Sequence, residues 1–107
     1  MKFTINRRTW YRGQGADHSA LLKQDGTRCC VGFYARALGL KKADILCAPT
    51  LEDVNTGDRA DYCDLEGSND LQDIYEINDT QDMTEKERED QIKAIFEQHD
   101  VQVMFRN

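Results

Sequence analysis

The chain has 107 residues, of which 39% are hydrophobic and 32% charged, and its net charge is −6 at neutral pH. This length has room for one domain with one core, and the apolar content is too high for an intrinsically disordered chain. No apolar run approaches the roughly 20 residues of a transmembrane helix, and no signal-peptide core follows the charged N-terminus. We therefore expect a single cytoplasmic domain spanning residues 1–107.

Charge is divided unevenly along the chain. Residues 1–43 contain nine Lys/Arg and two Asp/Glu, a net charge of +7, whereas residues 44–90 contain three and sixteen, a net charge of −13. A surface of one sign steers association with a partner of the opposite sign. Either the two halves neutralise each other inside the fold, or one of them faces a partner.

Both ends of the chain are predicted to form strands. Polar and apolar residues alternate over 2–5 and again over 101–105, as they do in strands with one buried face. After the first strand, Asn6 is a good N-cap for a short helix that Gly13 would end. A small sheet made from both termini is therefore expected.

A hairpin is predicted next. Asp25 and Gly26 separate two short segments, 19–23 and 27–30, and an Asp-Gly pair between such segments is typical of a tight β-turn. We expect these segments to add two strands to the sheet.

The segment 29–40 predicts a buried central helix. Apolar residues cover nearly its whole circumference, and Arg36 is its one charged residue. Gly32 would allow another element to approach closely, and Gly39 is a suitable C-terminal cap.

The acidic half predicts further helices. Short helices are expected within 41–47 and 51–55, an irregular acidic loop at about 56–67, and a helix from 68 or 69 to about 77. A capping box then opens the long helix 84–99. The expected fold is α+β: terminal strands and the hairpin form a small sheet that packs against the central helix and the long C-terminal helix.

Two adjacent cysteines raise an enzymatic alternative. Cys29 and Cys30 lie at a predicted helix N-terminus, where a thiol pKa can be lowered, and His18 is a candidate base. Small buried cysteines are the simpler interpretation. The Cys-x₂₋₄-Cys spacing of structural zinc sites does not occur, so we predict no metal site. We also predict no cofactor and no catalytic residue. The alternative is a small cysteine-dependent enzyme or a metal-binding factor.

A basic, aromatic segment raises a second alternative. Arg7, Arg8, Trp10, Tyr11 and Arg12 mix cations with rings, a pattern that binds bases and phosphates. The second alternative is therefore a nucleic-acid or nucleotide binder that uses this basic N-terminal region. The negative net charge argues against direct nucleic-acid binding, because nucleic-acid-binding domains are usually basic.

The acidic residues of the second half recur every two to four positions and form the leading candidate site. Displayed together, they would present a row of negative charge to a basic surface built for phosphates, although a solvated acidic face is the simpler interpretation. The predicted partner-binding residues are Asp58, Asp61, Asp64, Glu66, Asp70, Asp73, Glu76 and Asp79.

Two segments carry a family resemblance. Residues 10–13 read W-Y-R-G and residues 21–33 read L-L-K-Q-D-G-T-R-C-C-V-G-F, with Val31 where Leu is usual. This resembles a group of small bacteriophage and prophage proteins with a W-x-R-G … L-L-x-x-x-G-x-x-C-C-L-G-F pattern. The group has no established activity, so no residue role carries over, and the resemblance implies only a phage setting.

The phage setting and the acidic row together suggest a function. We expect a phage accessory protein that acts in the host cytoplasm, binds a host protein or ribonucleoprotein with a basic surface, and modulates it. The specific hypothesis is an anti-CRISPR or other anti-defence inhibitor with a nucleic-acid-mimicking surface, which rests on analogy with other small acidic phage proteins.

Overall fold

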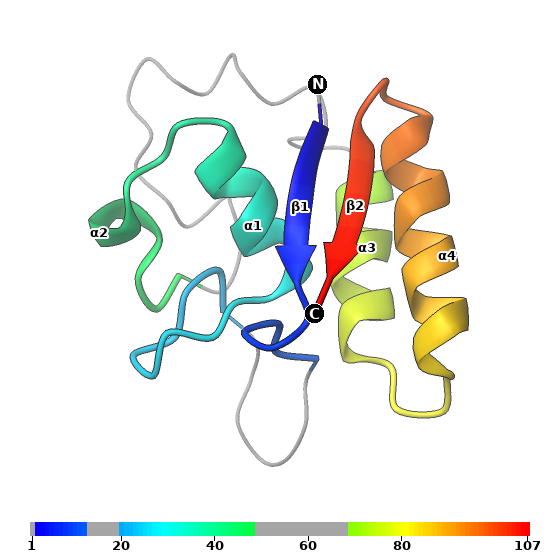
Figure 1. Ribbon diagram of the computed structural model, residues 1–107, viewed down its shortest axis with the longest axis horizontal. Coiled ribbons are helices and arrows are strands. Elements are labelled where there is room, and N and C mark those ends of the chain that lie inside the picture. The colour runs from blue at the N-terminus through cyan, green and yellow to red at the C-terminus, as the bar shows by residue number, and fades with distance from the viewer. Residues whose placement is uncertain (1, 13–19, 49–68) are drawn as a thin grey trace.

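The two ends of the chain lie side by side in the computed structural model, which describes residues 2–12, 20–48 and 69–107 (Figure 1). β1 (Lys2–Asn6) and β2 (Gln102–Arg106) pair in parallel, with Phe3 opposite Val103. Both predicted terminal strands are therefore confirmed. Since parallel strands need a crossover connection, all the described helices lie between them in the chain.

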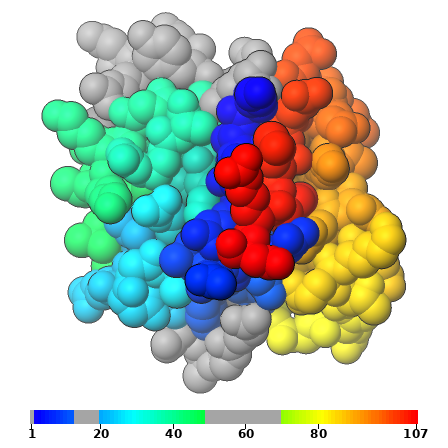
Figure 2. Space-filling model, viewed as in Figure 1, coloured from blue at the N-terminus to red at the C-terminus, as the bar shows by residue number. Residues whose placement is uncertain are grey.

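Two of the four described helices make most of the contacts with this sheet. The helices are α1 (Cys30–Ala37), α2 (Lys42–Ile45), α3 (Asn69–Asp79) and α4 (Glu85–Glu97). α1 packs beside β1 and α4 beside β2, while α3 contacts both α1 and α4 (Figure 1). Alternate strand residues are buried against these helices, and the remaining ones are exposed on the opposite face, which is visible in Figure 2. The predicted α+β class is confirmed.

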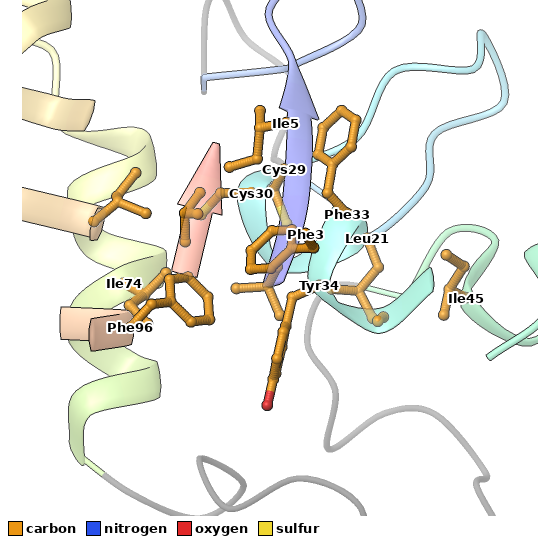
Figure 3. Packing of buried hydrophobic residues seen from close by; sticks show 14 of the residues in the cluster. Phe3, Ile5, Leu21, Cys29, Cys30, Phe33, Tyr34, Ile45, Ile74 and Phe96 are labelled. Atoms are coloured by element: carbon orange, nitrogen blue, oxygen red, sulfur yellow. The ribbon is translucent and has the colours of Figure 1, made fainter. Parts of the chain in front are cut away.

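Aromatic rings join the sheet to the helices at the centre of the core. The Phe96 ring of α4 lies 5.2 Å from the Phe3 ring and 5.1 Å from the Tyr34 ring, measured between centroids (Figure 3). α1 is buried from Cys30 to Ala35, so the predicted central helix is confirmed.

Gly32 marks the closest approach to α1. A Cβ atom built at this position would overlap the backbone carbonyl of Leu21, so no larger residue fits without a shift of the chain. The predicted role of Gly32 in close packing is confirmed.

The prediction of a short helix after Asn6 is wrong. The Asn6 side chain accepts a hydrogen bond from the amide of Arg8 (3.0 Å), and the Asn6 carbonyl accepts one from Thr9 (3.1 Å), but the turn ends there. The chain then becomes extended, and Trp10 pairs with Arg28 in an isolated bridge. Burial of Trp10 and this pairing outweigh the gain from one helical turn, because helix nucleation is costly.

The predicted hairpin is present only as a turn. Gly26 has a φ of 92°, and the amide of Lys23 donates to the carbonyl of Thr27 across the turn (2.7 Å). Its flanks do not join the sheet of the described residues, which has two strands. Leu22 instead forms an isolated bridge with Leu46 after α2, and the other flank pairs with the N-terminal segment. The prediction of a four-stranded sheet is therefore wrong, because the backbones of both flanks pair with other segments.

The helices of the acidic half begin and end close to their predicted positions. α2 lies within 41–47, and α3 extends two residues beyond 77. Thr84 caps α4 by accepting a hydrogen bond from the amide of Glu87 (3.2 Å), as the capping box predicts. The predicted helix 51–55 and the predicted loop 56–67 lie outside the described residues. None of the helices in the described ranges is both long and apolar enough to cross a membrane.

Candidate functional site

Half of the predicted partner-binding residues lie on α3. Asp73, Glu76 and Asp79 are exposed there, and Asp70 is partly buried. The other predicted residues lie outside the described part of the chain: Asp58, Asp61, Asp64 and Glu66.

The helical repeat decides which of these carboxylates share a face. Leu71 and Ile74 are buried on the inner side of α3, against α1 and α4. Side chains three residues apart on an α-helix differ in direction by about 60°. Asp73, Glu76 and Asp79 therefore spread over the outer side of α3, opposite the buried side. We call these three residues the acidic face.

Asp70 does not belong to the acidic face. Its Oδ2 atom lies 2.8 Å from Nε2 of His99, which follows the C-terminal end of α4. This contact links the start of α3 to the end of α4. The predicted site residue Asp70 therefore joins two helices rather than facing outward with the others.

A shallow depression accompanies the acidic face. Its lining includes Glu76 and Asp79 together with the half-buried ring of Tyr75. Two carboxylates beside an aromatic ring suit a cationic side chain, which interacts favourably with both. Tyr75 is not among the partner-binding residues predicted from the sequence, because spacing of charges gives no signal for an aromatic residue.

The basic N-terminal segment neutralises α4 instead of α3. Arg7 makes a two-pronged contact with Glu89, from Nε (2.8 Å) and from Nη2 (2.7 Å), and this hydrogen bonding raises the pKa of Arg7. Arg12 pairs with Glu85 at 2.9 Å.

The acidic face, in contrast, keeps its charge. Within the described residues, neither Asp73 nor Glu76 forms an ion pair, and both are exposed. Arginines of the basic half therefore pair with carboxylates of α4, whereas Asp73 and Glu76 on α3 remain exposed to solvent.

The basic segment is not arranged for base stacking. Trp10 is 4% exposed, and its Nε1 donates to Oδ1 of Asn78 at 2.7 Å. The guanidinium of Arg12 covers the ring, 4.4 Å from its centroid. Neither ring face is open to a base, which weakens the nucleic-acid-binding alternative.

The adjacent cysteines are core residues. Cys29 and Cys30 are 1% and 0% exposed, and burial raises the pKa of Cys29 to about 12 and that of Cys30 well above its ordinary value. The candidate base His18 lies outside the described residues. A neutral, buried thiol is a poor nucleophile, which weakens the enzymatic alternative. Across residues 2–12, 20–48 and 69–107, no three Asp, Glu, His or Cys side chains are grouped to bind a metal ion.

Comparison with protein-family models, with curated proteins and with solved structures finds no match to this chain. The functional argument therefore rests on the chemistry of the surface itself.

Proposed function

We propose that this protein binds another protein, and that the acidic face of α3 contacts a basic surface of that partner. One observation carries the proposal: Asp73 and Glu76 remain exposed without an ion pair among the described residues, although the same chain supplies arginines that neutralise α4. From the resemblance to phage proteins, we propose that the partner is a host protein and that the specific role is inhibition of a host defence complex.

The spacing of the acidic face supports mimicry of a nucleic acid. Residues three apart on an α-helix are separated by about 4.5 Å along its axis. This is comparable to the roughly 3.4 Å between successive phosphates of one strand along the axis of duplex DNA. A groove that binds a phosphate backbone would therefore meet carboxylates at a similar density, and the partner's own nucleic acid would be excluded.

The depression beside Tyr75 supports a direct contact with a basic side chain. An arginine or lysine entering it would lie against the ring while its charge meets Glu76 and Asp79. Such a contact adds orientation to the long-range attraction, because the ring accepts the cation over its face.

Capture from a bacterial lysate tests the proposal. The tagged protein is immobilised, lysate is applied at low and at high salt, and bound proteins are identified by mass spectrometry. We expect a host protein or ribonucleoprotein that is captured at low salt and released at high salt, since exposed charge pairs are screened. Capture that is empty at both salt concentrations contradicts the proposal.

A charge-reversed variant assigns the captured protein to the acidic face. Asp73→Lys with Glu76→Lys raises the net charge by four, and both sites are exposed. The matched control places the same change at exposed positions of α4 and at its C-cap residue, as Gln91→Lys, Glu97→Lys and Gln98→Lys. Loss of capture in the first variant and retention in the control is expected. Equal capture by both variants would show that the acidic face does not bind.

A further inference from the structure

The depression beside the acidic face brings an aromatic ring and two carboxylates to one side of α3. It has a volume of about 410 Å³ and is lined by Gln72, Tyr75, Glu76, Asp79 and Thr80. Side chains three or four residues apart on an α-helix are neighbours. Because Asp79 follows Glu76 by three residues and Tyr75 by four, both carboxylates and the ring border the same space.

Contacts within the fold hold these groups in place. The Tyr75 side chain is half-buried and packs against the hydrophobic core. Nδ2 of Asn78, a residue that is 1% exposed, donates to Oδ1 of Asp79 at 2.9 Å. Nε2 of Gln72 donates to Oε1 of Glu76 at 3.4 Å. Because the ring and the carboxylates are ordered in advance, less conformational entropy is lost when a ligand binds.

The chain itself shows which cation suits such a site. Cζ of Arg12 lies 4.4 Å from the centroid of the Trp10 ring. In the same guanidinium, Nη1 lies 2.9 Å from Oε2 of Glu85. One guanidinium therefore contacts an aromatic ring and a carboxylate at the same time.

Arg7 repeats this arrangement with other residues. Its Cζ lies 5.7 Å from the centroid of the Phe105 ring, and its Nε and Nη2 both donate to Glu89. A guanidinium can make both contacts because it is planar: its face lies over a ring while its N–H groups donate within its own plane. The ammonium of a lysine has no flat face and concentrates its charge at one point. A ring beside carboxylates therefore favours arginine over lysine.

We propose that the depression binds an arginine side chain of the partner protein. The guanidinium lies over the Tyr75 ring and donates hydrogen bonds to Glu76 and Asp79, as the chain's own arginines do at their sites. This inference rests on the proposed function, because it names the side chain through which the partner contacts α3. It also goes beyond charge attraction, which by itself does not distinguish arginine from lysine.

Titration with N-acetyl-arginine amide, followed by NMR at constant pH and ionic strength, tests the site. The blocked ends of this probe leave the guanidinium as its only charge. We expect the amide signals of Tyr75, Glu76 and Asp79 to shift and to saturate. N-acetyl-lysine amide carries the same charge and should bind more weakly, by roughly threefold or more.

Two isosteric variants separate the depression from the charge of the helix. Glu76→Gln removes a carboxylate that lines the depression, whereas Asp73→Asn removes an exposed carboxylate, three residues earlier, that does not. Glu76→Gln should weaken binding of the arginine probe by roughly fivefold or more, since a charge-assisted hydrogen bond is lost. Asp73→Asn should weaken it by less than about twofold, because salt screens the remaining long-range attraction.

A second pair of variants tests the ring. Tyr75→Phe keeps the aromatic face and should bind the arginine probe within about twofold of wild type. Tyr75→Leu keeps an apolar side chain against the core but removes the ring, and it should weaken binding by roughly threefold or more. The amide spectra of both variants show whether α3 keeps its fold.

Four results would each overturn the arginine site. They are no saturable shift with the arginine probe, equal binding of the lysine probe, equal weakening by Glu76→Gln and Asp73→Asn, and wild-type binding by a folded Tyr75→Leu variant. If salt-sensitive capture from lysate persists beside any of these results, the acidic face remains the interface and only the arginine contact is excluded. An empty capture contradicts the proposed function, whatever the probes bind.

Discussion

Asn78 joins three parts of the chain through a single buried amide. Its Oδ1 accepts hydrogen bonds from Nε1 of Trp10 (2.7 Å) and from the amide of Cys30 (3.0 Å), and its Nδ2 donates to the carbonyl of Tyr11 (3.1 Å). The side chain is 1% exposed. Close by, Gly32 lies against the backbone carbonyl of Leu21. Trp10, Cys30 and Gly32 therefore have a structural role in this fold.

Replacement of Asn78 by leucine is expected to destabilise the fold strongly. The variant keeps the volume but leaves the indole N–H of Trp10 and the amide of Cys30 buried without an acceptor, at about 1–3 kcal/mol for each group. Urea denaturation should therefore show a loss of about 2–6 kcal/mol in the free energy of unfolding. Gln91→Ala, at an exposed position of α4, serves as the control and should change it by less than about 0.5 kcal/mol. A similar small loss for both variants would contradict the role of Asn78.

Ionisation of the buried thiols is expected to lower stability at alkaline pH. The folded state raises the pKa of Cys29 from 9.0 to about 12, and it also raises that of Cys30. Above pH 9 the unfolded chain releases these protons while the folded chain retains them, so the free energy of unfolding falls as pH rises. The fall should be about 1 kcal/mol per thiol between pH 9 and 10.

Denaturation of wild type and of the Cys29→Ala, Cys30→Ala double variant at pH 8, 9 and 10 measures this effect. The double variant should lose less stability over this range, since lysines and tyrosines titrate alike in both proteins. Parallel pH profiles would show that the thiols are accessible to solvent.

Helices in this fold depend on residues outside themselves. Arg88 of α4 is 3% exposed, and its guanidinium donates to the carbonyls of Ile77 (2.6 Å), Asn78 (2.8 Å) and Thr80 (2.6 Å). These bonds satisfy the end of α3, where the last carbonyls have no partner within the helix. One helix therefore supplies the C-terminal cap of its neighbour.

A pair of substitutions on α4 tests this cap. Arg88→Met should lower the free energy of unfolding by about 2–4 kcal/mol, because two carbonyls in the last turn of α3 and the carbonyl of Thr80 just after it lose a charged donor. Lys86→Met, two residues earlier, removes an exposed ion pair with Asp90 and should cost less than about 0.5 kcal/mol. Both values come from urea denaturation. Equal losses would mean that Arg88 acts only as another surface charge.

The elements that sequence patterns predicted well are those with local signals. The apolar circumference of α1 and the capping box at Thr84 are both readable within one segment, and both helices were confirmed. The helix predicted after Asn6 and the hairpin strands were wrong because their backbones pair with distant segments, as Leu22 does with Leu46. The cap made by Arg88 gave no signal, because an arginine among charged helical residues resembles a solvated one.

At the scale of the whole molecule, the two charged halves meet only in part. Arg7 and Arg12 lie against α4, whereas Asp73 and Glu76 on the outer side of α3 remain exposed. The acidic row could be predicted from spacing alone. The sequence did not predict that Asp70 would contact His99 instead of joining the acidic face, or that Tyr75 would lie beside that face. Both follow from the packing of α3 against its neighbours.

The affinity of the captured partner for wild type and the two charge variants tests the central claim most directly. Titration calorimetry should show that Asp73→Lys with Glu76→Lys weakens binding by roughly tenfold or more, a change of about 1.4 kcal/mol or above. The equally charged control, with Gln91, Glu97 and Gln98 replaced by lysine, should bind within about twofold of wild type, a change of about 0.4 kcal/mol. Equal weakening by both variants would show that net charge alone drives association, and unchanged affinity in the first would exclude the acidic face of α3 from the interface.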